Sequence, residues 1–281
     1  ILGAVGRAAH QGAVIKGGVA LEILGRTDTV VLDKTGTLTF GRPEVVALRP
    51  VPGTGETSLP ETAAIAERPS EHALARAILT RAAGATPREP DRFESLPGKG
   101  VRANIDGSQI LAGNRAFLAG EGVALPDVSA APKGGTEVFV ARGGTYLGSI
   151  EVADTLRPEA VAAVRALRGM GLRTVLLTGD ARSVAESIGK QLGVDEVRAD
   201  LLPLDKVERI RELTGAGSTV VMVGDGVNDA PALVEASVGI AMGSGTDVAR
   251  ECASVVLIGN DLAKLVETLR IARRCRRIIF A

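Results

Sequence analysis

The sequence is poor in aromatic residues, and neither sign of charge dominates it. It contains no Trp, one Tyr and five Phe among 281 residues. So few aromatic side chains argue against a surface that stacks on bases, and they leave the core to be built from Val, Leu, Ile and Ala. The 33 basic residues are balanced by 33 acidic ones, which removes the electrostatic argument for a polyanionic partner. We therefore expect no nucleic-acid partner.

Cysteines are also scarce, and long apolar runs are missing. Cys252 and Cys275 lie far apart and form no CxxC pair, so we expect free thiols in a reducing compartment. No signal peptide is evident, and no apolar run reaches the ~18 residues of a membrane span; the chain as it stands is expected to be soluble. The basic cluster at 273–277 precedes apolar residues. This order is typical of a segment entering a membrane helix, and equally of a helix end favoured by the helix dipole.

The pattern of apolar residues predicts a parallel sheet. Short β-branched runs predict buried strands at 29–32, 174–177, 219–223, 238–241 and 255–258. Helical patterns lie between several of them, at 158–168, 184–192 and 206–213. Strands that alternate with helices predict a Rossmann-like α/β fold with helices on both faces of the sheet, and ligands bind at the carboxyl ends of such strands.

Residues 42–147 differ from the rest of the chain in composition and in the pattern of predicted elements. This stretch holds Pro/Gly-rich spacers, one clear helix at 70–83 and short strands near 101–105 and 137–140. We interpret it as a smaller α+β domain inserted after the first strand of the larger one. The larger domain then comprises residues 1–41 and 148–281.

Polar motifs follow the predicted strands. DKTGTLT at 33–39 places a carboxylate at a strand tip before small hydroxyl residues and Gly, whose backbone N–H groups can hold phosphate oxygens while the carboxylate attacks phosphorus. TGD at 178–180 could contact the same oxygens. Lys206 offers a point charge for the developing negative charge. GDGVND at 224–229 supplies the paired carboxylates that suit Mg²⁺. Together these motifs predict a phosphoryl-transfer site.

The three motifs resemble the signature set of P-type ATPases, membrane pumps of the haloacid-dehalogenase superfamily. The resemblance covers the chain from about Gly12 to the C-terminus and implies a phosphorylation domain of haloacid-dehalogenase type with an inserted nucleotide-binding domain. By this resemblance Asp33 accepts the γ-phosphate of ATP and Lys206 steadies it. The remaining residues implied in catalysis are Thr35, Thr178, Gly179 and Asp180. The implied Mg²⁺ ligands are Asp33, Thr35, Asp225 and Asp229, with Asn228 in support.

Elements within the insert resemble the adenine-recognition residues of the heavy-metal (type IB) class. Glu67 and His72 lie five positions apart, and Gly98-Lys99-Gly100 follows. An imidazole can stack on a purine or bond to its edge, and Gly lets the backbone approach a nucleotide closely. The sequence departs from the family at Ala73, where Pro is usual, so its assignment to a copper-type or zinc-type subgroup stays open.

The resemblance implies a catalytic fragment on the cytoplasmic face of a membrane. Segments at about 1–24 and 262–281 would flank membrane helices, and the transmembrane domain, the actuator domain and the transported cation would be partners outside this sequence. Three alternatives remain. A soluble phosphatase of the superfamily needs an Asp-x-Asp pattern, but Thr35 stands at the second position. An inactive regulatory module would not need the intact motif set. A potassium pump is disfavoured by Glu67 and His72.

Overall fold

The computed structural model describes residues 1–84, 88–127, 135–226, 229–243 and 245–279. The chain forms two compact units, one made of Ile1–Gly41 and Leu156–Ala281, the other of Arg42–Thr155. The sequence pattern places the end of the second unit at residue 147. The structure places it at Thr155, because strand β8 (Thr145–Leu156) continues without a break through the position where the sequence suggests a boundary.

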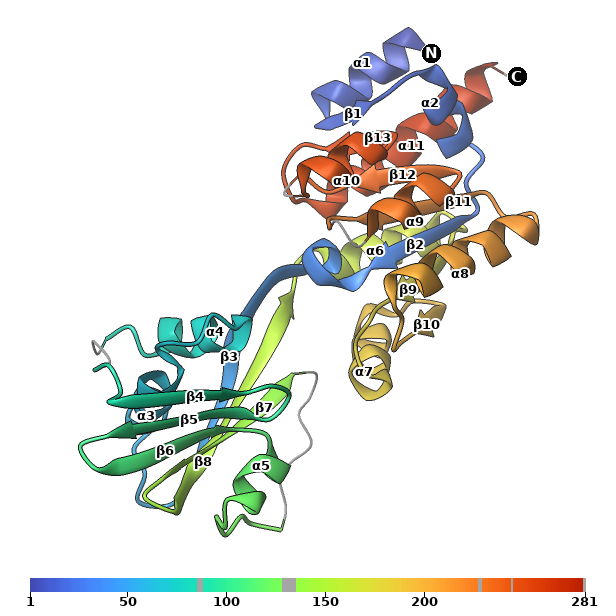
Figure 1. Cartoon of the computed structure of the whole chain (residues 1–281). Coiled ribbons are helices and arrows are strands. Elements are labelled where there is room, and N and C mark those ends of the chain that lie inside the picture. The colour runs from blue at the N-terminus through green and yellow to red at the C-terminus, as the bar shows by residue number, and fades with distance from the viewer. Residues whose placement is uncertain (85–87, 128–134, 227–228, 244, 280–281) are drawn as a thin grey trace. The chain divides into compact units, whose positions relative to one another are not determined.

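Seven strands form the sheet of the first unit, in the order β1-β13-β12-β11-β2-β9-β10 (Figure 1). Their bounds are β1 Ala13–Ile15, β2 Thr29–Asp33, β9 Arg173–Leu177, β10 Glu196–Arg198, β11 Val220–Gly224, β12 Val238–Ala241 and β13 Val255–Leu257. Neighbouring strands run parallel, except that β1 is antiparallel to β13. The α/β fold with a parallel sheet is thus confirmed.

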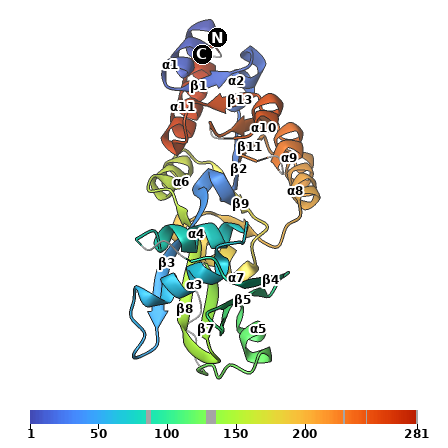
Figure 2. The same ribbon diagram turned by 60° about the vertical axis from the view of Figure 1, so that its left-hand side comes forward.

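Helices cover both faces of this sheet, because its central strands are apolar on both sides. Val30 and Leu32 of β2 face one core, whereas Val31 faces the other. The first core is closed by α1 Leu2–His10, α2 Gly18–Leu24, α6 Ala160–Gly169, α7 Arg182–Leu192 and α11 Leu262–Ile279. The second is closed by α8 Pro203–Gly215, α9 Ala230–Glu235 and α10 Asp247–Cys252. Figure 2 shows α6 and α11 on one side of the sheet and α8, α9 and α10 on the other. No helix among the described residues is long and apolar enough to cross a membrane.

The second unit is built on a six-stranded sheet in the order β3-β8-β7-β6-β5-β4. Its other strands are β3 Thr39–Pro50, β4 Arg92–Leu96, β5 Gly100–Ile105, β6 Ser108–Gly113 and β7 Thr136–Arg142. The pairs from β4 to β8 are antiparallel. Helices α3 Ser58–Glu67 and α4 Ala73–Arg81 supply the apolar side chains that pack on one face. Helix α5 Arg115–Gly120 packs with a separate cluster that includes Leu111 and Phe139. The predicted α+β architecture is confirmed, although the sequence pattern missed α3.

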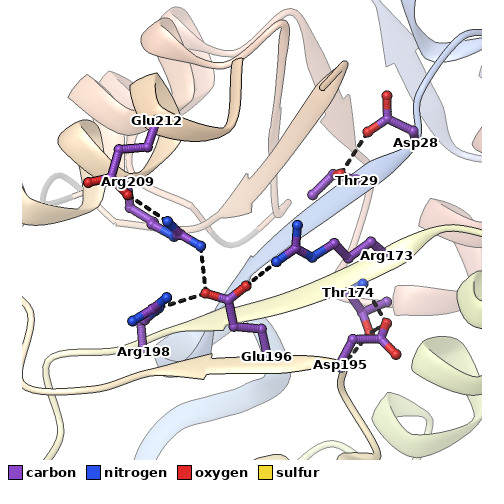
Figure 3. Close-up of polar contacts among 9 residues, drawn as sticks. All are labelled: Asp28, Thr29, Arg173, Thr174, Asp195, Glu196, Arg198, Arg209 and Glu212. Atoms are coloured by element: carbon purple, nitrogen blue, oxygen red, sulfur yellow. Dashed lines mark hydrogen bonds and ion pairs between the residues drawn. The ribbon is translucent and has the colours of Figure 1, made fainter. Parts of the chain in front are cut away.

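The edge strand β10 of the first unit is held by a charge network (Figure 3). The carboxylate of Glu196 accepts hydrogen bonds from Arg173 at 2.5 Å, Arg198 at 2.6 Å and Arg209 at 2.6 Å. Burial alone would raise the pKa of Glu196, but the bond from Arg198 and the charges of Arg209 and Arg198 outweigh it, and the pKa lies below its usual value. A carboxyl whose pKa is lower in the folded state stabilises the fold while it is ionised.

We expect Glu196→Gln to lower the free energy of unfolding at pH 7 by about 1 kcal/mol, a surface-network value, because three guanidinium groups lose their shared anion. The loss should shrink as the pH falls below 4.5, the usual pKa of Glu, since the unfolded parent then takes up a proton that the folded parent binds only at lower pH. Urea unfolding at several pH values measures both effects. Glu212→Gln is the matched control, because Glu212 is 63% exposed and contacts only Arg209 of this network. Equal losses in the two variants, or a loss that does not change with pH, would contradict this interpretation.

Candidate active site

The predicted catalytic motifs meet at one edge of the parallel sheet. Asp33 is the last residue of β2 and pairs in register with Leu177, the last residue of β9. Thr178 follows β9 directly, and Asp225 follows β11 on the other side of β2. Because parallel strands end at the same edge, the sheet brings together residues that are far apart in sequence.

Lys206 connects two of the carboxylates. It lies in the first turn of α8, which begins at Pro203, and it donates to Asp33 Oδ1 at 2.5 Å and to Asp229 Oδ1 at 2.8 Å. All three side chains are buried. Burial alone would lower the pKa of Lys206, but the charges of Asp33 and Asp229 raise it above its usual value. Lys206 is therefore an ammonium group and joins α8 to the strand edge.

Asp225 completes a cluster of three carboxylates. Oxygen atoms of Asp33, Asp225 and Asp229 all lie within 4.8 Å of one another. Burial, followed by the charge of Asp229, raises the pKa of Asp33 to about 7 and that of Asp225 to about 6. Three carboxylates around one ammonium leave an excess of negative charge, and their oxygens are the hard ligands that Mg²⁺ prefers. These residues fit the predicted Mg²⁺ ion. Asn228, predicted to support it, lies outside the described residues.

The turn after Asp33 has the shape of an anion-binding loop. Gly36 has a φ of 72°, and a Cβ atom there would lie 1.5 Å from Asp225 Oδ2. Only Gly therefore lets the Asp225 carboxylate approach this turn. The hydroxyl of Thr37 is buried and has no hydrogen-bond partner among the described residues. Buried polar groups are normally hydrogen-bonded, so this hydroxyl is suited to bind a polar ligand. Thr35, predicted to act in catalysis and to bind metal, is exposed on this turn.

Lys206 contacts Asp33 directly, whereas the TGD segment contacts the residue beside it, Lys34. Asp180 forms an ion pair with Lys34 at 2.6 Å, and its N–H donates to Thr178 Oγ1 at 3.1 Å. Gly179 lies against the carbonyl of Leu201, which a Cβ atom would meet at 3.1 Å. Asp180 is thus tied to the DKTGTLT turn through Lys34. Lys34 was not predicted as a site residue, although its place beside Asp33 is a signal that could have indicated it.

A second candidate site lies in the other unit. Glu67, His72, Gly98 and Gly100 line one cavity of about 280 Å³, which also includes Asn114. His72 caps α4, and its Nδ1 accepts from the N–H of Leu74 at 3.2 Å. In the neutral ring this bond leaves the proton on Nε2, which can donate to a ligand. Burial, opposed by a hydrogen bond from Ser70, raises the pKa of Glu67 to about 7, so this carboxyl can present a donor or an acceptor near neutral pH.

Asn114 holds the glycine turn of this cavity and was not predicted from the sequence. Its Nδ2 donates to Gly98 O at 2.9 Å, while its Oδ1 caps α5 by accepting from Phe117 N at 2.8 Å. A Cβ atom on Gly100, whose φ is 148°, would lie 2.2 Å from Ala112 O, so the turn can sit against β6 only as Gly. The signal was the Gly113-Asn114 pair at the end of a strand, which is typical of a helix N-cap. Ala73, where the family usually has Pro, is the first residue of α4 and lets the helix begin there.

We expect Asp225→Asn to stabilise the metal-free protein. A carboxyl whose pKa rises from 3.8 to about 6 on folding costs stability as the pH increases through that interval. At pH 7.5 without divalent ions, the variant should be more stable by about 1–2 kcal/mol, a value reduced for the exposed part of the side chain. Saturating Mg²⁺ should remove or reverse the difference, because the parent then gains the free energy of binding.

Thermal unfolding with EDTA and then with Mg²⁺ tests this expectation, and Glu186→Gln on the exposed face of α7 is the control. A variant that is less stable than the parent in EDTA would mean that folding does not raise the pKa of Asp225.

Comparison with known proteins assigns the family. Residues 27–237 match the haloacid dehalogenase-like hydrolases. A copper-transporting P-type ATPase of Rhizobium leguminosarum bv. viciae is 43% identical over 99% of this chain and 34% of its own length, and a copper-exporting P-type ATPase of Staphylococcus aureus is 43% identical over 93% and 33%. The chain thus spans about a third of the length of these curated relatives.

Solved structures agree with this assignment. A zinc-transporting PIB-type ATPase in the E2.Pi state superimposes with a TM-score of 0.88 and 40% identity over 99% of this chain and 46% of its own. The catalytic domain of the CPx-ATPase CopB-B superimposes with a TM-score of 0.74 and 30% identity over 95% of this chain and 98% of its own. The chain therefore belongs to the haloacid dehalogenase-like hydrolases and, among them, to the catalytic regions of heavy-metal (type IB) P-type ATPases.

Proposed function

We propose that this chain binds ATP and transfers its γ-phosphate to Asp33 within a heavy-metal-transporting P-type ATPase. The observation that supports the proposal most strongly is the contact of Lys206 with both Asp33 and Asp229 inside a cluster of three carboxylates. The copper and zinc transport named for its relatives suggests a soft heavy-metal cation as the transported species. In the full-length protein, the chain works on the cytoplasmic face of the membrane with its own transmembrane and actuator domains.

In the proposed reaction, one Asp33 oxygen attacks the γ-phosphorus in line. An O–P bond forms to Asp33, the bond between the γ-phosphorus and the bridging oxygen breaks, and ADP leaves with that electron pair. Lys206 holds the other carboxylate oxygen and neutralises charge that develops on the phosphoryl group. Asp33, Asp225 and Asp229 would hold Mg²⁺, which supplies further charge neutralisation when bound. The Thr37 hydroxyl and the backbone of the turn receive the phosphoryl oxygens.

The proposed site does not favour rapid hydrolysis of the phosphoenzyme. A phosphatase of this superfamily carries a carboxylate two residues after the nucleophile to deprotonate water. Thr35 occupies that position and is exposed on the turn, and a hydroxyl group cannot act as a base at neutral pH. The aspartyl phosphate should therefore persist, which a pump requires and a phosphatase does not.

The cavity around His72 is the proposed adenine site. The Nε2–H of His72 and the carboxyl of Glu67 can bond to the purine edge, or the imidazole ring of His72 can stack on the purine. The Gly98–Gly100 turn leaves room for a flat ring. The cavity belongs to the second unit and the carboxylate cluster to the first, so adenine recognition and phosphoryl transfer are assigned to different units of the chain.

Asp33→Asn should abolish phosphorylation. With radiolabelled ATP and Mg²⁺, the parent should give an acid-stable, hydroxylamine-sensitive label, because aspartyl phosphates survive acid and react with hydroxylamine. The variant keeps the shape of the side chain but loses the nucleophilic charge, and it should show only background label. Asp247→Asn, at an exposed position in the first turn of α10, is the matched control and should label like the parent. Label that persists in Asp33→Asn would move the acceptor elsewhere.

His72→Ala should weaken ATP binding by about 1–2 kcal/mol, the value of one hydrogen bond or one stacked ring. The chain offers a matched control, because its only other histidine, His10, is an exposed residue in α1 of the other unit. Isothermal titration of each variant with a non-hydrolysable ATP analogue measures the difference. Equal affinity of His72→Ala, His10→Ala and the parent would place the adenine elsewhere.

A further inference from the structure

Arg157 is a buried cation that none of the sequence motifs includes. Its residue is 4% exposed, and it stands where the chain re-enters the first unit after β8. A guanidinium group is costly to bury unless its N–H groups find partners. Here Nε donates to Thr37 O at 2.9 Å, one terminal nitrogen to Gly36 O at 2.9 Å and the other to Asn260 O at 3.1 Å. All three of these acceptors are backbone carbonyls.

Two of the three carbonyls belong to the turn that follows Asp33. In a planar trans peptide, the N–H points opposite to the C=O of the same plane. By holding the carbonyls of Gly36 and Thr37, Arg157 therefore also sets the direction of the next two N–H groups, which point away from it. The planar fork of a guanidinium fixes such a pair of acceptors at one mutual orientation, which the point charge of Lys does not.

Arg157 is itself held in place from several sides. Its backbone N–H donates to Leu38 O at 2.9 Å, and its carbonyl accepts from Ala160 N at 3.0 Å. Its guanidinium lies 5.0 Å from the centre of the Phe40 ring. The third carbonyl, that of Asn260, precedes α11, which begins at Leu262. The side chain thus joins the DKTGTLT turn to the start of the long C-terminal helix.

We propose that Arg157 is a positioning residue for phosphoryl transfer: it fixes the backbone of the turn that receives the phosphate and ties this turn to the start of α11. The inference rests on the proposed phosphorylation of Asp33. Arg157 does not touch the reacting atoms in this account; it acts through the peptide planes of Gly36 and Thr37. A displacement of the turn moves the phosphoryl-binding groups away from Asp33, and such misplacement can cost up to ~10²-fold in rate.

The test compares Arg157 with a second arginine that makes the same kind of contact elsewhere. Arg273 of α11 donates to the carbonyls of Met170 and Thr27, away from the carboxylate cluster. Arg157→Gln, Arg157→Lys and Arg273→Gln are compared with the parent by their rates of Asp33 labelling, their ATP affinities and their melting temperatures. All rates are measured well below the lowest melting temperature of the set.

We expect both Arg157 variants to label at least ~10-fold more slowly than the parent, with ATP affinity changed by less than about threefold. Arg157→Lys is the milder substitution and keeps the positive charge. Slow labelling of this variant would therefore show that the planar guanidinium group is needed and that a positive charge alone is not enough. Arg273→Gln should lose melting temperature yet label like the parent. Labelling of Arg157→Lys and Arg157→Gln within twofold of the parent overturns the inference, as does an equal loss of rate in Arg273→Gln. A parent that does not label at all contradicts the proposed function instead.

Discussion

The parallel alignment of β2 with β9 and β11 is the constraint on which the site depends. It brings one carboxylate to the tip of β2 and a second to the end of β11. Lys206 of α8 and Asp229, which directly precedes α9, lie at the same edge. Burial, and after it the repulsion among the three carboxylates, raises the pKa of Asp33 and of Asp225. The apolar packing of the sheet on both faces supports this unfavourable arrangement. The same repulsion favours a divalent cation, so the feature that costs stability is also the one suited to phosphoryl transfer.

The sequence predicted the parts of the molecule whose signals are local. Central strands such as β2 and β11 are apolar on both faces and therefore form continuous β-branched runs, which were recognised. Helix α3 was missed because Pro60 lies in its first turn and its apolar face consists largely of Ala, so its helical period is weak. Strand β10 was not predicted, because it has only three residues and is held by Arg173 and Arg209, which are distant from Glu196 in sequence.

The site was predicted to the extent that its residues lie in contiguous motifs. Asp33, Asp225 and Asp229 stand in DKTGTLT and GDGVNDAP, and the structure brings them together with Lys206. The pairing of Lys34 with Asp180 and the contacts of Arg157 could not be deduced from spacing, since each joins segments that meet only in three dimensions. Asn114 had a local signal, a helix N-cap, but its contact with Gly98 depends on the pairing of β5 with β6.

In the proposed reaction Asp33 itself carries the phosphate. An aspartyl phosphate is an acyl phosphate, and borohydride reduces it to homoserine, whereas free carboxylates and phosphate esters do not react. The protein is incubated with MgATP, quenched, treated with borohydride and digested, and the peptides are analysed by mass spectrometry. We expect homoserine at position 33 only after incubation with both ATP and Mg²⁺. Homoserine at another aspartate, or unmodified Asp33 in a sample that carries stoichiometric phosphate, would contradict it.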